Sequence, residues 1–158
     1  MGKELVRREM TELEIRPARP EDLAGILTLE RACFRPPWTE RSLSEEMNDP
    51  DGLTLAALRG GRLAGFCMMH RAGDQAELYQ IAVCPEERRA GVALELLRSA
   101  ETAAGGRGMG EAFLEVRASN APAVGLYEKA GWRRLGTRRN YYVDPVEDAL
   151  LYGKELKE

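Results

Sequence analysis

The segment spanning residues 79–93 combines residue types that could hold a phosphate group. Its sequence, YQIAVCPEERRAGVA, runs from an apolar strand through a loop into the start of a helix. A helix start offers unpaired N–H groups and the positive end of the helix dipole, and small residues such as Ala90 and Gly91 let a phosphate approach the backbone. Arg88 and Arg89 add positive charge. An ordinary strand-to-helix turn is the alternative, and composition alone does not separate the two.

Two well-defined nucleotide-binding patterns are absent from the sequence. It contains no G-x-x-x-x-G-K-[ST] motif, and no G-x-G-x-x-G motif followed about 20 positions later by an acidic residue. The loop therefore predicts neither a nucleoside triphosphate site nor a dinucleotide site.

Two residues downstream of the loop could move protons. Glu115 interrupts an otherwise apolar strand at 112–116, where a carboxylate is costly unless it is solvated or paired, and it could act as a base. A merely solvent-facing glutamate is the alternative. Tyr127 shares the apolar face of a predicted helix with Ala123 and Ala130. It could act as an acid, or it could only pack in the core.

Histidine and cysteine are scarce. His70 is the single histidine, and the three cysteines, Cys33, Cys67 and Cys84, are widely spaced without a C-x-x-C pair. We therefore expect no metal site and three reduced, buried thiols. His70 ends an apolar run and is expected to be a half-buried strand residue. No histidine near Cys84 in sequence could activate it, so a covalent cysteine intermediate is not expected.

Hydrophobic periodicity predicts the elements that position these residues. Strands are expected at 13–17, 53–58, 63–70, 76–83, 111–116, 132–142 and 147–156. Four helices are expected. The first follows Pro20 and carries Leu23, Ile26, Leu27 and Ala32 on its apolar face, and the second follows Thr39, which caps it. The third runs from Ala93 to Gly106, and the fourth runs from Asn120 to Ala130. Antiparallel strands followed by a strand-helix-strand crossover predict an α/β (α+β) fold, with a mixed sheet and helices on both faces.

The bulk properties exclude several classes of protein. The chain has 158 residues, a formal net charge of -3 and 31% charged residues of both signs. Residues 1–158 are expected to form a single domain, with 1–11 as a tail that need not be ordered. No apolar run approaches the roughly 18 residues of a membrane span, and the first ten residues lack a secretory signal. We expect a cytoplasmic protein without a membrane or direct nucleic-acid partner.

Several motifs together resemble the GCN5-related N-acetyltransferase (GNAT) superfamily. The order R-x-x-G-x-A begins at Arg88, and Asn120 and Tyr127 follow downstream. The stretches LEVRASN (114–120), LYE (126–128), RRNYY (138–142) and EDA (147–149) resemble its RimI branch, the acetyltransferases of a ribosomal protein's N-terminal alanine. The resemblance extends from about Leu13 to Leu156. It implies a splayed, mostly antiparallel sheet of about seven strands.

The resemblance also implies a reaction and a set of site residues. Acetyl would pass from acetyl-CoA to an α-amine by direct attack in a ternary complex without metal, with Glu115 as base and Tyr127 as acid. The residues expected to bind acetyl-CoA are Ile81, Ala82, Val83, Arg88, Arg89, Ala90, Gly91, Val92, Ala93, Leu94 and Asn120. Three positions depart from the pattern: Ala93 replaces a common glycine, Leu94 a polar residue and Cys84 an aspartate.

The acceptor side is implied by the same resemblance. Trp38, Arg139, Tyr141 and Tyr142 are expected to line the peptide groove. Four arginines, Arg133, Arg134, Arg138 and Arg139, form the local basic cluster, which could equally be plain surface. The expected acceptor is the N-terminal alanine of a ribosomal protein, modified by a monomer or weak dimer. A lysine or small-amine acceptor, and a non-catalytic acetyl-CoA-binding module, are the alternatives.

Overall fold

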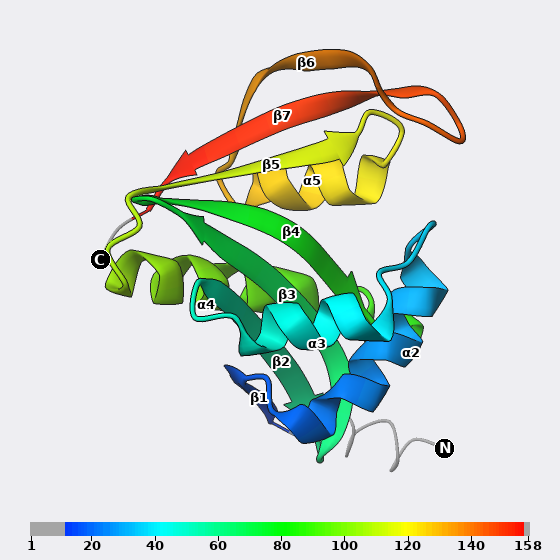
Figure 1. Cartoon of the computed structure of the whole chain (residues 1–158), viewed down its shortest axis with the longest axis vertical. Coiled ribbons are helices and arrows are strands. Elements are labelled where there is room, and N and C mark those ends of the chain that lie inside the picture. The colour runs from blue at the N-terminus through cyan, green and yellow to red at the C-terminus, as the bar shows by residue number, and fades with distance from the viewer. Residues whose placement is uncertain (1–11, 157–158) are drawn as a thin grey trace.

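The computed structural model describes residues 12–156, so the expected tail at 1–11 lies outside the described residues. Seven strands form one sheet in the order β1-β2-β3-β4-β5-β7-β6 (Figure 1). All neighbouring strands are antiparallel except the parallel pair β4 and β5. The strands are β1 (Leu13–Pro17), β2 (Gly52–Arg59), β3 (Arg62–Ala72), β4 (Gln75–Val83), β5 (Glu111–Arg117), β6 (Arg133–Tyr142) and β7 (Glu147–Glu155). The predicted mixed, mostly antiparallel sheet is confirmed.

Helices cover both faces of this sheet. One face carries α2 (Leu23–Cys33) and α3 (Glu40–Asn48), and the other carries α4 (Val92–Gly106) and α5 (Ala121–Lys129) (Figure 1). Short 3₁₀ turns precede α2 (Pro20–Asp22) and α4 (Pro85–Glu87). Among residues 12–156, no helix combines the length and apolarity that a membrane crossing requires.

Local signals explain where the first helices begin and which faces they bury. The Oγ1 of Thr39 accepts a hydrogen bond from the Ser42 N–H at 3.0 Å, so the predicted cap of α3 is confirmed. The predicted apolar face of α2 is partly wrong, because Ala32 is exposed. Ala32 follows Ile26 by six residues. Because an α-helix has 3.6 residues per turn, this spacing directs Ala32 away from the side of the helix that buries Ile26 and Glu30.

The sheet opens between β4 and β5. These strands pair only at Gln75–Glu77 with Glu111–Phe113, and beyond this point they separate (Figure 1). A bulge in β4 lies just past the separation: Met68 pairs with Gln80 and Met69 pairs with Leu78, which leaves Tyr79 as the extra residue. The sheet is therefore open beyond Glu77 and Phe113, with β4 on one side of the opening and β5 on the other.

Candidate active site

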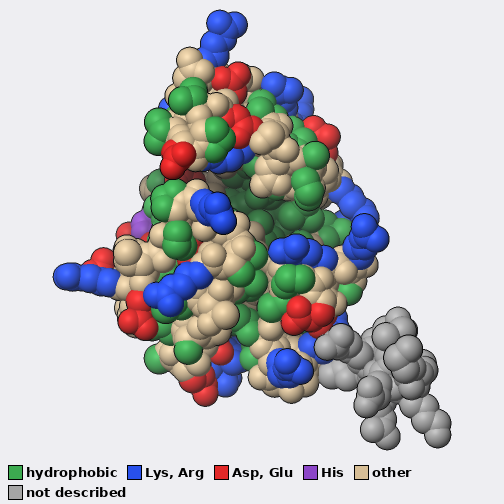
Figure 2. Space-filling model, turned by 90° about the vertical axis from the view of Figure 1, so that its right-hand side faces the viewer, with side chains coloured by type: hydrophobic (Ala, Val, Ile, Leu, Met, Phe, Trp, Pro, Cys, Tyr) green, Lys and Arg blue, Asp and Glu red, His purple; other side chains and the backbone are tan. Residues whose placement is uncertain are grey.

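Backbone groups of β4 face the opening between β4 and β5. The Cys84 N–H donates to the Ala64 carbonyl of β3 at 2.8 Å, and antiparallel pairing alternates with a period of two residues. Ala82 must therefore direct its backbone groups toward β3, whereas Ile81 and Val83 direct theirs toward β5. Because β5 has already separated, the N–H and C=O groups of Ile81 and Val83 have no partner strand on this side within residues 12–156 and can bind a ligand. Figure 2 shows this side of the molecule hollowed, with hydrophobic side chains in the hollow and Lys or Arg side chains at its rim.

The loop before α4 has the backbone geometry of an anion site. Arg89 and Gly91 adopt positive φ values of 69° and 79°. The first helical hydrogen bond runs from the Glu95 N–H to the Gly91 carbonyl, and no side chain caps the helix. The N–H groups of residues 92–94 thus lack helical partners at the positive end of a 15-residue helix. This arrangement fits the pyrophosphate of a coenzyme.

Two of the expected coenzyme residues also make structural contacts. Asn120 is the N-cap of α5, where its Oδ1 accepts from the Ala123 N–H at 3.3 Å, leaving its amide NH₂ group as the part that can donate to a ligand. The Nη2 of Arg88 lies 3.9 Å from the Sγ of Cys33 at the end of α2. Arg88 thus lies in the predicted loop before α4, and Asn120 lies at the start of the predicted helix α5.

Glu115 is both solvated and paired. Its neighbours Leu114 and Val116 point into the core beneath α4 and α5, so the strand alternation places Glu115 on the opposite face, where its side chain is 24% exposed. The Nε of Arg138 lies 3.3 Å from its Oε1. The hydrogen bond between Tyr141 and Glu115 raises the pKa of Tyr141. The carboxylate is therefore accessible and held by two groups of β6.

Tyr127 projects from α5 into the core next to the cleft. Only 6% of it is exposed, and its ring packs 6.4 Å from that of Tyr152. Burial raises the pKa of the Tyr127 phenol, and the Cys67 thiol and Tyr142 phenol add to this rise. Cys67 pairs with Ile81 in the β3–β4 ladder, so the tyrosine lies near the strand that offers its backbone to the cleft. Like an ordinary tyrosine, Tyr127 is protonated at neutral pH, and its raised pKa makes it a weaker acid.

Tyr142 is half-buried at the end of β6. The guanidinium of Arg117 lies 4.4 Å from its ring centroid, and its ring meets that of Tyr141 edge-on at 5.1 Å. Burial first, and then the charge of Glu115, raise the pKa of Tyr142 to about 12. Arg139, the other residue expected on this part of β6, is exposed.

A buried carboxylate anchors Trp38, and the sequence analysis missed it. The Oε2 of Glu30 accepts hydrogen bonds from the Trp38 N–H and the Gln80 Nε2, each at 2.9 Å. The Trp38 ring also lies 5.7 Å from that of Tyr79. The available signal was the position of Glu30 on the buried face of α2 with Ile26, where a charge requires partners.

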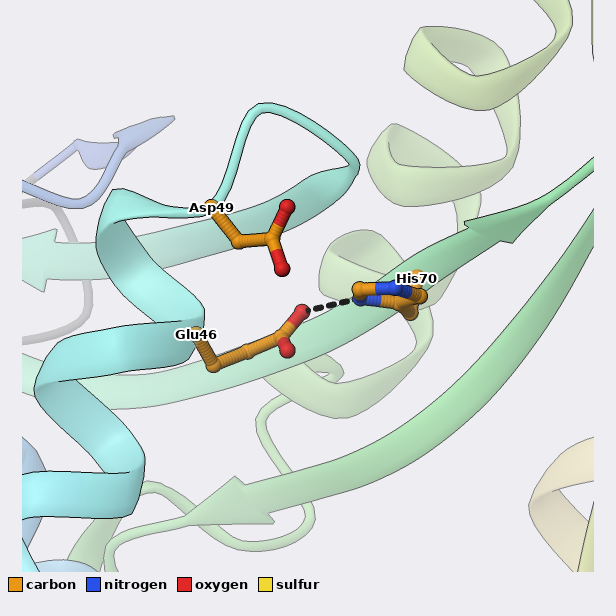
Figure 3. Close-up of side chains that lie close together, drawn as sticks. All are labelled: Glu46, Asp49 and His70. Carbon is orange, nitrogen blue, oxygen red and sulfur yellow. Dashed lines mark hydrogen bonds and ion pairs between the residues drawn. The ribbon is translucent and has the colours of Figure 1, made fainter.

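His70 forms a histidine–carboxylate pair on the same face of the sheet. Its Nδ1 lies 2.8 Å from the Oε2 of Glu46, and Asp49 completes a group whose potential ligand atoms lie within 4.8 Å of one another (Figure 3). The hydrogen bond to Glu46 raises the pKa of His70, so the imidazolium form persists to higher pH. The predicted half-buried position of His70 is confirmed.

The cysteines only partly match their prediction. All three are free thiols, but only Cys67 is fully buried, and Cys33 and Cys84 are half-buried. The expectation of three buried thiols is therefore wrong for two of them, because both lie at element ends beside the cleft loop. The Sγ of Cys84 lies 3.3 Å from the Leu63 carbonyl, and burial raises the pKa of the Cys84 thiol, which disfavours a reactive thiolate.

Gly65 allows β3 to approach the coenzyme-binding end of β4. A Cβ at this position would lie 2.6 Å from the Ala82 carbonyl oxygen and 3.2 Å from a methyl group of Val83. Replacing Gly65 with alanine is expected to lower the free energy of unfolding by about 1–3 kcal/mol, because the backbone of β4 must move. Urea unfolding of Gly65→Ala against Gly125→Ala, whose Cβ meets open space, measures this effect. Equal stabilities of the two variants would contradict the close approach.

Comparisons with known proteins agree with this geometry. Residues 23–132 match the model of the Acetyltransferase (GNAT) family. A [ribosomal protein bS18]-alanine N-acetyltransferase of Escherichia coli (strain K12) is 34% identical over 82% of this chain and 88% of its own length. N-alpha-acetyltransferase RimI of Mycobacterium tuberculosis (strain H37Rv) is 34% identical over 75% and 76%. A Bacillus subtilis (strain 168) protein, named provisionally for the bS18 activity, is 36% identical over 94% and 99%.

Solved structures lead to the same family. The crystal structure of the ribosomal-protein-S18-alanine N-acetyltransferase from Escherichia coli has a TM-score of 0.83 and 31% identity, over 93% of this chain and 96% of that one. The expectations of fold, family and enzyme class are thereby confirmed. The chain belongs to the acetyltransferase (GNAT) family and is an acetyl-CoA-dependent N-acetyltransferase.

Proposed function

We propose that this enzyme acetylates the α-amine of a protein N-terminus, with the N-terminal alanine of a ribosomal protein as its acceptor. One observation carries the proposal: the accessible carboxylate of Glu115, which is paired with Arg138, lies on β5 beyond the point where β5 separates from β4, across the opening from the backbone groups of Ile81 and Val83. The names of the relatives that act on ribosomal protein bS18 support the same acceptor.

Acetyl-CoA binds along β4 and the start of α4 in this proposal. Ile81 and Val83 donate and accept hydrogen bonds with the pantetheine arm through their backbone, and Ala82 between them keeps its side chain in the core beneath α2. The N–H groups of residues 92–94 and the loop 88–91 hold the pyrophosphate, since anions bind at helix N-termini. The amide NH₂ group of Asn120 donates to the pantetheine from the other side of the cleft.

Glu115 accepts the proton that the incoming ammonium must lose before it can attack. At pH 7 this deprotonation costs roughly 1 kcal/mol for an α-amine and roughly 4.6 kcal/mol for a lysine, from their usual pKa values. Chemistry alone thus favours an N-terminus. The Arg138 side chain is 58% exposed, so its ion pair with Glu115 is weak and can yield to the substrate ammonium.

The acetyl transfer then needs stabilisation of an oxyanion and protonation of a thiolate. The amine nitrogen forms a bond to the thioester carbon, and the negative carbonyl oxygen accepts hydrogen bonds from the free N–H groups of β4. The C–S bond breaks, and Tyr127 gives its proton to the CoA sulfur. After the attack the nitrogen still carries two hydrogens, and it loses one of them to solvent as the amide forms. Glu115 releases to solvent the proton that it took from the amine, and Tyr127 regains one, so that one proton is released overall.

The acceptor peptide lies between two groups of aromatic side chains. Trp38 and its loop form one wall, and Tyr141 and Tyr142 form the other with the exposed Arg139 at the rim. Tyr141 is 49% exposed, which leaves its ring available for contact with a peptide.

Thermal stabilisation by acetyl-CoA and release of free CoA thiol together test this function. We expect acetyl-CoA to raise the melting temperature, and a peptide beginning with alanine to trigger thiol release. The same peptide with a blocked α-amine should release none. Stabilisation without thiol release across N-terminal peptides and simple amines would identify a coenzyme-binding module and contradict the proposal.

A further inference from the structure

The His70–Glu46 pair ties α3 to β3 beside the bulge of β4. The side chain of Glu46 is 9% exposed and that of His70 is 21% exposed, so water competes little for their 2.8 Å contact (Figure 3). Hydrogen bonds between charged groups are among the stronger ones, and shielding from water strengthens them further. The pair can therefore hold the His70 ring in one orientation.

The held ring of His70 stacks on Tyr79. Their ring centroids are 5.2 Å apart with an interplanar angle of 12°, and Trp38 contacts Tyr79 at 5.7 Å and 51°. Tyr79 is the extra residue of the bulge, so regular strand alternation does not set the direction of its side chain. Among residues 12–156, the aromatic rings that contact Tyr79 and can set the direction of its side chain are those of His70 and Trp38.

Tyr79 lies on the face of the sheet that also presents Glu115. The half-buried Tyr79 packs against the core cluster beneath α2 and α3, which includes Phe66. Glu115 points to this same face, because its neighbours Leu114 and Val116 are buried on the other face with α4 and α5. Tyr79 also precedes by two residues Ile81, whose backbone faces the thioester site.

We propose that His70, held by Glu46, is a positioning residue of the acceptor site. It fixes the ring of Tyr79, which together with Trp38 forms the wall against which the first side chain of the acceptor packs. A fixed ring limits the room for that side chain and favours alanine over leucine. This inference rests on the proposed function and adds to it the source of selectivity for a small first residue.

Four variants of the full chain test the proposal, with two peptides that differ only in having Ala or Leu first. His70→Ala is expected to raise the KM for the Ala peptide about tenfold, the size of one aromatic pair, and to reduce the preference for Ala over Leu. Its kcat and its KM for acetyl-CoA should stay within about twofold of wild type. His70→Phe restores the stacked ring, so its KM should return to within about threefold of wild type.

The other two variants separate positioning from general loosening. Glu46→Gln keeps the ring but removes the charge that holds it, and it should raise the acceptor KM about threefold. Arg71→Gln is the matched control, because Arg71 follows His70 on β3 and donates to the carbonyls of Gly73 and Arg107. Its acceptor KM and its Ala preference should equal those of wild type.

The outcomes distinguish this inference from the function on which it rests. If the wild-type enzyme transfers acetyl and His70→Ala has the same acceptor KM as wild type, the inference is overturned and the proposed function stands. Equal changes in the acceptor and acetyl-CoA KM values, or an equal defect in Arg71→Gln, also overturn it. Should His70→Ala fail to fold, an unchanged acceptor KM in Glu46→Gln overturns the inference. A wild-type enzyme without transfer to either peptide contradicts both.

Discussion

Replacing Glu115 with glutamine is expected to lower kcat/KM for an N-terminal peptide by roughly 10² to 10⁴-fold, because an amide cannot take the proton of the amine. The fold should be preserved, since Glu115 lies on the accessible face of β5 and glutamine can still accept from Arg138 and Tyr141. Initial rates of thiol release measure the effect. The deficit should shrink as the pH rises past about 8, where a free α-amine is already deprotonated.

Glu111→Gln is the matched control for this variant. Glu111 lies on the same strand, four residues earlier and on the same face, where it is exposed. The Glu111→Gln enzyme should turn over at the wild-type rate. This result would show that the loss of activity in Glu115→Gln does not come from the change in the net charge of β5. Wild-type-like rates in Glu115→Gln at pH 7 would reject Glu115 as the base.

Replacing Tyr127 with phenylalanine is expected to lower kcat by roughly 10² to 10³-fold and to leave the KM for acetyl-CoA nearly unchanged. The variant removes the proton donor for the departing thiolate, whereas the ring that packs against Trp132 and Tyr152 remains. The melting temperature should therefore change little. Single-turnover release of CoA thiol measures the step directly.

Tyr152→Phe controls for the loss of a buried hydroxyl. Tyr152 packs against Tyr127 and donates its own hydroxyl hydrogen bond to Glu128 at 2.8 Å. This variant should lose some stability and keep its turnover number. A Tyr127→Phe enzyme as fast as wild type, or a Tyr152→Phe enzyme equally slow, would show that Tyr127 only packs in the core.

Much of the fold could be predicted because its signals are local. Gly60 and Gly61 adopt the positive φ values of a tight hairpin, and Thr39 caps its helix through a neighbouring N–H group. The position of β7 between β5 and β6 was not predicted, because pairing between β5 and β7 joins residues over 30 positions apart. Such a pairing depends on the whole sheet and leaves no pattern within one segment.

The candidate site shows the same limit. Strand alternation and the family motifs identified Glu115, but not its partner Arg138, which reaches it from two strands away. The β6–β7 register shifts between Arg138 and Tyr142, and Asn140 adopts a positive φ of 51°, so the directions of these side chains do not follow simple alternation. His70 appeared unremarkable in the sequence because Glu46, its partner, lies 24 residues away on α3.

The position of the acetyl group on one peptide tests the central claim most directly. A peptide that begins with alanine and carries an internal lysine should be incubated with the enzyme and acetyl-CoA, and then sequenced by tandem mass spectrometry. The arrangement of Glu115, Tyr127 and β4 predicts one acetyl group, on the alanine nitrogen. Acetylation restricted to the lysine side chain, or an unmodified peptide alongside enzyme shown to bind acetyl-CoA, would contradict it.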